Sequence, residues 1–402
     1  MDGVGAAPAR GGLVTRATQA RDARDVQEAI RDASERGAAL RIAGAGTWLD
    51  GGRPVDAAEQ LSLGGWRGIV EYVPGDLTLT AHAGTPLDDL ARATGAENQW
   101  LTLDPIGAPS GTIGATVATA SAGPLAHAFG TPRDAVLGLE TVTGGGVLVR
   151  SGGRVVKNVA GFDLTRLFTG SWGTLGVITQ VTVRLRPRPE VDETVALAVS
   201  DEATGMGALL DRLRCAPVAP LAAEIVSAAL AARLGLERRT SLLLRLGGNA
   251  ASVRAQRAGV AALGDSVSVP TAVWPALVTR DEGGAAVIRL SSRPSRLSEL
   301  WVAAARAAQA HGAADGAFAH ASVGRGIVRC LAEAQPVEAL ERWLHALVTA
   351  DATRIIEKLP IAMWVAPPMP TPSPVGGRIS RALKDAFDPS GILNPGIHGA
   401  PA

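Results

Sequence analysis

The chain has 402 residues, of which 47% are hydrophobic and 19% charged, and its formal net charge is +1 at pH 7. This composition is typical of a globular protein with large cores and argues against disorder. A chain of this length is expected to form two or three domains. The balanced charge argues against a nucleic-acid-binding protein. No run reaches the roughly 18 apolar residues of a membrane-spanning helix, and the features of a signal peptide are not expected in residues 1–10.

The two cysteines, Cys215 and Cys330, lie far apart and form no Cys-x-x-Cys pair. We therefore expect neither an Fe–S cluster nor a zinc ribbon in this chain. Two lone cysteines in a chain of this size are more often reduced core residues than a disulfide, which fits a cytoplasmic, reducing compartment.

Hydrophobic periodicity predicts mixed helices and strands in the first half of the chain. Residues 17–36 have the spacing of an amphipathic helix, and Pro86 is expected at the start of another. Residues 104–134 are rich in small side chains, which suits backbone packed against something large and flat. The predicted strands are 38–43, 68–73, 77–83, 136–142, 146–150 and 176–186.

Prolines at 187 and 189 predict a domain boundary near residue 190. In residues 191–366 helical and strand-like patterns alternate, which predicts a second α/β unit. A proline-rich linker at 367–377 then leads to a last helix at 378–387. The predicted elements of the second unit are helices 203–214, 250–263, 295–311 and 336–349 and strands 241–247, 285–290, 316–320 and 326–331.

A glycine turn, Gly44-Ala45-Gly46-Thr47, follows the predicted strand 38–43. The Rossmann fingerprint needs a third glycine at the sixth position, which here is Leu49, so the standard nicotinamide fold is disfavoured. Neighbouring glycines can still expose backbone N–H groups to a pyrophosphate. Taken alone, the motif is a weak signal, and an ordinary tight turn is the default interpretation.

Further glycine-rich stretches follow at 111–123 and 153–178, the second containing the run Lys-Asn-Val-Ala-Gly-Phe-Asp at 157–163. The run Phe-Asp-Pro-Ser-Gly-Ile-Leu-Asn-Pro-Gly occupies 387–396. In order and spacing these motifs resemble the PCMH-type FAD-binding domain of the vanillyl-alcohol-oxidase superfamily and, within it, the FAD-binding subunit of glycolate oxidases. The resemblance covers about residues 17–190 and 378–398.

The resemblance implies an α+β fold with noncovalently bound FAD. Residues 1–190 would form a PCMH-type FAD-binding domain of two α/β subdomains, and residues 191–366 an α/β cap domain. Residues 367–402 would form a linker, helix and tail that pack back on the FAD domain. The implied cofactor-binding residues are Gly44, Ala45, Gly46 and Thr47 at the pyrophosphate, Gly111, Thr112, Ile113, Gly114, Ser121 and Gly123 along the flavin and phosphates, Gly176, Val177 and Ile178 near the adenine, and Lys157 and Asn394 toward the flavin.

Plain alternatives stay open for several of these residues. Lys157 also fits a surface lysine, and Asn394 lies in an Asn-Pro-Gly turn that favours local backbone bonding. Arg133 and Asp134 are expected to form a structural ion pair. Covalent flavin attachment needs a His, Cys or Tyr facing the ring, and the pyrophosphate loop has none. His127 is the weak exception.

One departure from the resemblance concerns catalysis. Related 2-hydroxy-acid dehydrogenases of the superfamily carry a His-x-Gly-Asp-Gly-Asn-x-His-like motif, whereas the stretch that begins at His320 has a single histidine and no aspartate. One histidine cannot make a zinc site, so no metal is expected. No general base and no other catalytic residue can be named. Arg325 and Arg329 could bind a carboxylate as a fork, but solvated surface arginines are the stronger expectation.

The resemblance therefore implies an FAD-dependent oxidoreductase acting on CH–OH groups. It would be the FAD-binding subunit of a glycolate oxidase-like complex that converts glycolate or D-lactate to the 2-oxo acid. A homologous larger FAD subunit and an Fe–S subunit would be its partners, and contact with the inner face of a membrane would be indirect. A self-sufficient FAD oxidoreductase and a non-catalytic structural subunit stay open as alternatives.

Overall fold

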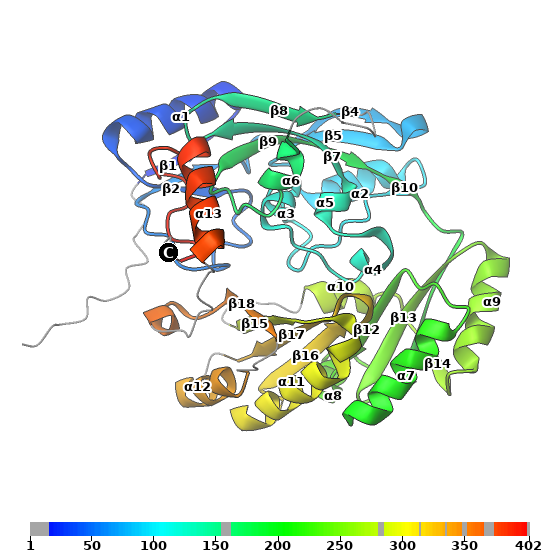
Figure 1. Cartoon of the computed structure of the whole chain (residues 1–402). Helices are drawn as coiled ribbons and strands as arrows, with labels where there is room; N and C mark the ends of the chain where they lie inside the picture. Colours follow the sequence, from blue (N-terminus) through cyan, green and yellow to red (C-terminus); the bar gives the residue numbers. More distant parts are fainter. Residues whose placement is uncertain are drawn as a thin grey trace, which may run out of the picture.

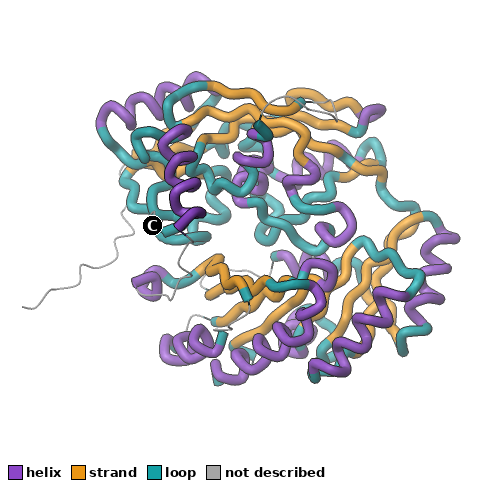
Figure 2. Tube along the Cα trace, in the orientation of Figure 1, coloured by secondary structure: helices purple, strands orange, loops and turns teal. Residues whose placement is uncertain are grey.

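The computed structural model describes residues 16–153, 162–279, 285–312, 315–333, 336–347, 352–365 and 374–399. Within these ranges the chain forms two α/β bodies, drawn one above the other in Figure 1. The upper body contains the first half of the chain and the C-terminal helix, and the lower body is built on one broad sheet. Loops of the upper body face this sheet, while most of the lower body's helices lie on the far side of it (Figure 2).

The upper body begins with a parallel sheet of order β1-β3-β2 among the described residues. Its strands are β1 (Arg16–Gln19), β2 (Leu40–Ala43) and β3 (Glu59–Ser62). The helix predicted over 17–36 is wrong at its start, because β1 pairs with β3 and helix α1 (Ala23–Arg36) begins only after Asp22. The Asp22 side chain accepts a hydrogen bond from Asp25 N at 2.9 Å, which caps the helix there.

A second sheet of the upper body is antiparallel, with the order β4-β5-β9-β7-β8. Its strands match the predicted ones to within two residues. They are β4 (Ile69–Val73), β5 (Thr78–His82), β7 (Val136–Thr143), β8 (Leu148–Gly152) and β9 (Gly176–Arg184), with the 3-10 turn η1 (Pro74–Asp76) between β4 and β5. The associated helices are α2 (Leu87–Gly95), α3 (Ile113–Thr119), α4 (Ala126–Phe129), α5 (Pro132–Ala135) and α6 (Leu164–Phe168). A short antiparallel pair, β6 (Gln99–Trp100) and β10 (Arg186–Pro187), precedes the lower body.

The lower body's sheet has the order β14-β11-β13-β12-β16-β17-β15-β18 in the described ranges, and its neighbouring strands are antiparallel. The four strands predicted in this unit are confirmed as β13 (Ser241–Gly248), β15 (Ala286–Ser291), β16 (Ala317–Ser322) and β17 (Ile327–Ala332). The sequence analysis missed β11 (Val191–Ala198), β12 (Ala222–Val226), β14 (Ser266–Val269) and β18 (Thr353–Lys358). β12 lies in a continuous apolar run whose periodicity does not distinguish strand from helix.

The two faces of this sheet are covered differently. The outer face carries the predicted helices, α7 (Ala203–Cys215), α9 (Ala250–Ala261), α11 (Leu297–His311) and α12 (Val337–Ala346). Of the described residues, two short helices of the lower body pack on the inner face against Phe318 and its neighbours, α8 (Ala228–Arg233) and α10 (Val273–Val278). Because side chains alternate along a strand, His320 and Ser322 share the face of Phe318 while Ala319 and Ala321 enter the outer core. His320 and Ser322 therefore face the upper body.

The C-terminal segment returns to the upper body, and its helix α13 (Pro374–Phe387) begins within the predicted linker. Proline is tolerated in the first turn, where its missing N–H costs no hydrogen bond. After α13 the chain pairs with β2, since Leu40 N donates to Ile392 O and Asn394 N donates to Leu40 O. The Asn394 side chain, 4% exposed, accepts from Ile42 N at 2.8 Å and donates to Trp172 O at 2.7 Å.

Two smaller expectations can be compared with the structure. Cys215 and Cys330 are both free, but only Cys330 is buried, so the expectation of a core position was wrong for Cys215. None of the helices described here combines the length and the apolar character that crossing a membrane requires.

Replacing Asn394 with alanine should destabilise the upper body. The substitution leaves the half-buried Ile42 N–H and Trp172 C=O without their protein partners, which costs about 1 kcal/mol of unfolding free energy. Denaturant unfolding measures the change. Gln309→Ala, on the exposed side of α11, is the control and should shift stability by less than about 0.5 kcal/mol. Equal losses in the two variants would contradict the anchoring role of Asn394.

Candidate functional site

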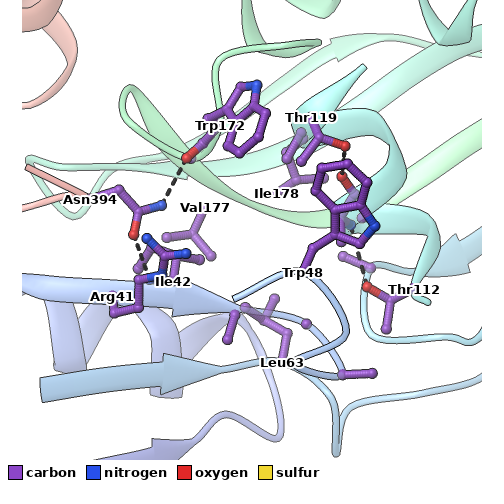
Figure 3. A pocket seen from close by; sticks show the side chains of 18 of the residues that line it. Arg41, Ile42, Trp48, Leu63, Thr112, Thr119, Trp172, Val177, Ile178 and Asn394 are labelled. Atoms are coloured by element: carbon purple, nitrogen blue, oxygen red, sulfur yellow. Dashed lines mark hydrogen bonds between the residues drawn. The ribbon is translucent and has the colours of Figure 1, made fainter. Parts of the chain in front are cut away.

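A narrow crevice of about 90 Å³ opens in the upper body where β2, α3, β9 and the C-terminal tail meet. Figure 3 shows Trp172 and Asn394 on one side of it and Trp48 and Thr112 on the other. The crevice collects residues from every glycine-rich stretch that the sequence analysis singled out. The predicted site residues that line it are Gly44, Ala45, Gly46, Thr47, Thr112, Gly114, Gly176, Val177, Ile178 and Asn394.

The other predicted residues lie elsewhere. Gly111 lines a small hollow on the far side of Thr112, and Ile113 is buried in the core of the upper body. Ser121 and Gly123 line a second, larger cavity. Lys157 lies outside the described residues, so its predicted role stays a prediction.

The glycine turn after β2 presents unused hydrogen-bond donors. In the part of the chain that the structure describes, the backbone N–H groups of Ala45, Gly46 and Thr47 have no acceptor. Ala45 and Gly46 are exposed, and Gly46 has a φ of +81°, a conformation that glycine adopts without strain. Adjacent free N–H groups form a concave site for an anion. This donor set fits the pyrophosphate of a dinucleotide.

Close backbone packing holds this turn against α3. A side chain at position 44 would collide with Thr112 Oγ1, and one at position 114 would collide with Ala83. Glycine at both positions therefore lets the turn, α3 and the end of β5 approach one another closely. The interpretation of Gly44 as a merely local turn residue does not explain this contact with Thr112, which is distant in sequence.

The second cavity, of about 630 Å³, lies between the two bodies. It is adjacent to the crevice, because Trp48, Thr119, Trp172 and Ile397 line both. The rings of Trp48 and Trp172 meet edge to face at 6.3 Å between centroids, and His398 packs on Trp172 at 5.9 Å. A ligand longer than the crevice would therefore extend past these two tryptophans into the cavity.

A histidine–carboxylate pair stands on the wall of this cavity. His320 Nδ1 lies 2.8 Å from Glu224 Oε2, and Ser322 Oγ donates to Glu224 Oε1 at 2.5 Å. Glu224 is 1% exposed and His320 5%. A carboxylate oxygen can accept from the Nδ1–H of a neutral imidazole, the tautomer in which Nε2 keeps its lone pair. His320 Nε2 is buried and has no partner among the described residues.

This pair is the functional feature that the sequence analysis missed. Glu224 and His320 are 96 residues apart and meet because β12 and β16 are neighbours in the sheet. The available signal was the alternation along β16, which puts a polar His320 two residues after Phe318. No group of three or more His, Cys, Asp or Glu that could hold a metal occurs within the described ranges.

Three arginines have different surroundings from those that the sequence predicted. Arg329 is 5% exposed and donates from Nε to Glu357 at 2.6 Å, so its expected surface position is wrong. Arg325 is half-buried and lines the same cavity. The expected Arg133–Asp134 pair is replaced by another arrangement, in which Asp134 accepts from Thr131 N at 2.8 Å and Arg133 lines the cavity.

Burial changes the titration of several groups near the cavity. It raises the pKa of Asp104 to about 7, although Leu125 N donates to this carboxylate at 2.8 Å and partly offsets the effect. Burial lowers the pKa of His127 and of His398, which favours the neutral form of both imidazoles. His127, the histidine considered for covalent attachment, lies outside the lining of both the crevice and the cavity.

Comparison with known proteins agrees with this geometry. Residues 15–152 match the family model described as FAD binding domain, and residues 371–397 match the one described as FAD linked oxidases, C-terminal domain. The structure aligns with p-cresol methylhydroxylase at a TM-score of 0.73, with 16% identity, over 98% of this chain and 91% of that one. The chain thus has the predicted α+β fold, with one region that matches an FAD binding domain and another that matches the C-terminal domain of FAD linked oxidases.

Two curated relatives sharpen the comparison. Glycolate oxidase subunit GlcE of Escherichia coli is 39% identical over 176 residues, which are 44% of this chain and 49% of that protein. Glycolate oxidase subunit GlcD of Bacillus subtilis is 33% identical over 241 residues, 57% of this chain and 51% of that protein. The aligned part of the chain spans about half the length of each of these relatives.

Gly46→Val should weaken FAD binding. A β-branched side chain at a positive φ forces the turn out of the conformation that exposes its N–H groups. Losing charge-assisted hydrogen bonds to a phosphate predicts a Kd about tenfold to a hundredfold higher. Flavin absorbance per purified chain, followed by titration with FAD, measures this. Gly75→Val is the control, because a side chain there meets nothing within 4 Å. Unchanged affinity in the Gly46 variant would contradict the assignment.

Asp104 should make stability depend on pH. Its pKa is raised in the folded protein, so the folded state holds the proton more tightly than the unfolded chain. The contribution of Asp104 to the unfolding free energy therefore falls as pH rises from about 4 to about 7. Asp104→Asn keeps an acceptor for Leu125 N and removes the titration. The Tm of the variant should fall less than that of the wild type between about pH 5 and pH 8; parallel Tm profiles would contradict the assignment.

Proposed function

We propose that this chain is the FAD-binding subunit of a glycolate oxidase-like complex, and that a small 2-hydroxy acid is oxidised in the cavity between its two bodies. The observation that carries the proposal is the His320–Glu224 pair on the wall of that cavity, adjacent to the crevice with the free N–H groups. The match to an FAD-binding domain and the similarity to two glycolate oxidase subunits support it.

In this proposal FAD is bound noncovalently by the domain of residues 1–190, with residues 191–366 as the cap. The pyrophosphate accepts hydrogen bonds from the N–H groups of Ala45, Gly46 and Thr47. The adenine end lies by Gly176, Val177 and Ile178, and the flavin end reaches the cavity near Ser121 and Gly123. Lys157 and Asn394 remain proposed on the flavin side. Both the oxygen and the nitrogen of the Asn394 side-chain amide form hydrogen bonds with backbone groups. We therefore assign this residue to holding the C-terminal tail beside the cofactor.

The chain's own residues supply the proton chemistry. His320 Nε2 takes the proton of the substrate hydroxyl, and Glu224 orients the ring and stabilises the charged imidazolium. Arg329 and Arg289, which lie beside His320 in strand register, bind the substrate carboxylate. When bound, FAD would supply the acceptor for the hydride of the carbon that bears the hydroxyl. Loss of this proton and hydride leaves the 2-oxo acid.

The electrons would then pass to partner subunits, a homologous larger FAD protein and an Fe–S protein. We propose a cytoplasmic location, with contact to a membrane only through these partners. The self-sufficient oxidoreductase stays as a second candidate, because the cavity with its histidine–carboxylate pair lies within this chain.

The purified chain tests the proposal through its visible spectrum. We expect flavin bands, release of the flavin into solution on acid precipitation, and bleaching under anaerobic conditions when glycolate or D-lactate is added. Repeated turnover with oxygen or a dye and no partner would favour self-sufficiency. Absence of flavin would favour a structural subunit, and bound flavin that no 2-hydroxy acid reduces would contradict oxidation in this cavity.

His320→Gln should slow flavin reduction by the hydroxy acid about a hundredfold to ten-thousandfold, the usual contribution of a general base. FAD affinity and the flavin spectrum should be unchanged, since His320 lies on the cap wall. Stopped-flow absorbance under anaerobic conditions measures the rate. His345→Gln, on the exposed side of α12, is the matched control and should retain the full rate. Equal rates in the two variants would remove His320 from the mechanism.

A further inference from the structure

The wall of the cavity between the two bodies is unusually cationic. Six of its described lining residues are arginines and one is a carboxylate, Glu357. The arginines come from different elements, so no single helix or strand accounts for their convergence. They are Arg53 after the glycine turn, Arg133 in α5, Arg289 in β15, Arg325 in the 3-10 turn η3 (Val323–Arg325), Arg329 in β17 and Arg354 in β18.

Glu357 is already engaged. It accepts from Arg329 Nε at 2.6 Å and lies 3.4 Å from Arg289 Nε, so this carboxylate serves two arginines. These contacts hold both guanidinium groups on the inner face of the sheet, in the row that also contains His320. This end of the cavity is where the proposed function puts the carboxylate next to the reacting carbon.

Arg325 has no such partner. Its side chain makes no hydrogen bond or ion pair with any residue that the structure describes, although it is half-buried. Arg53 Nε is likewise buried and unpaired within the described part of the chain. Glu224 attracts Arg325 electrostatically but forms no ion pair with it, and both carboxylate oxygens of Glu224 already contact His320 and Ser322. The guanidinium donors of Arg325 therefore stay available to an anionic ligand in the cavity. The FAD pyrophosphate is assigned to the neighbouring crevice and would not supply this charge.

Cavity size does not decide between substrates, because the flavin ring would fill part of the 630 Å³. The number of arginines in the cavity wall does distinguish between substrates. A simple 2-hydroxy acid such as glycolate brings one carboxylate, which the Arg289–Arg329 end can hold. Arg325 lies in the turn that joins β16 and β17, and His320 lies in β16, two residues before the end of that strand. A second carboxylate on the substrate would reach toward this position.

We propose that the cavity selects 2-hydroxy acids that carry a second carboxylate, and that Arg325 binds this distal group. The inference rests on the proposed function and adds the substrate class. The oxidation is the same: the hydroxyl proton goes to His320, the hydride goes to the flavin, and both carboxylates are retained in the 2-oxo product.

Succinate and butyrate test the proposal, because both have four carbons and differ by one carboxylate. Binding of each to the FAD-loaded chain is followed by the change in flavin absorbance and by the shift in Tm, neither of which requires turnover. We expect succinate to bind about tenfold or more tightly than butyrate, as for one added charge-assisted pair. Anaerobic flavin reduction should likewise favour malate over 2-hydroxybutyrate.

Arg325→Gln should remove the preference for succinate while leaving butyrate affinity, flavin content and Tm without ligand unchanged. Arg325→Lys should restore part of the preference. Arg293→Gln, an exposed arginine just before the 3-10 turn η2 (Pro294–Arg296), is the control and should behave as wild type. Equal binding of the two acids, or a preference that survives in Arg325→Gln, would overturn the proposal. If glycolate reduces the flavin while succinate and butyrate bind equally well, the selection of a second carboxylate is overturned and the proposed function is retained.

Discussion

The free N–H groups of Ala45, Gly46 and Thr47 are the feature on which the rest of the account depends. Backbone donors are normally paired, and an adjacent set left open by the protein forms a concave site that can bind an anion. The turn that carries them is fixed at both ends. Leu63 N donates to Ala43 O before the turn, and after it Gly52 N donates to Glu357 O at 2.9 Å in the lower body. The donor set is therefore held in place before any ligand arrives.

The same region connects the crevice to the cavity. Lys358, which is buried, pairs with Asp50 at 3.0 Å and lies over the Trp48 ring at 4.8 Å. The preceding residue, Glu357, holds Arg329, which faces His320 across the strand pair β16–β17. One strand, β18, thus supports both the proposed pyrophosphate turn and the wall of the proposed substrate cavity. This arrangement explains how the two bodies can present one continuous site.

The sequence predicted what depends on local pattern. The glycine turn after β2, the antiparallel strands of the upper body and the helices of the outer face all follow from spacing within a few residues. The chemistry of the cap did not follow, because Glu224 and His320 become neighbours only through the pairing of β12 with β16. Arg329 looked like a surface arginine because its sequence context does not reveal Glu357, which reaches it from β18. The sequence predicted a helix in place of the first strand, β1, because the four residues of this strand show no clear hydrophobic alternation.

A structure of the chain determined with FAD bound tests the central claim most directly. The account predicts phosphate oxygens within hydrogen-bond distance of the N–H groups of Ala45, Gly46 and Thr47, and the flavin ring beyond Trp48 and Trp172 in the cavity that His320 lines. Phosphates bound away from this turn, or a flavin ring outside that cavity, would contradict it.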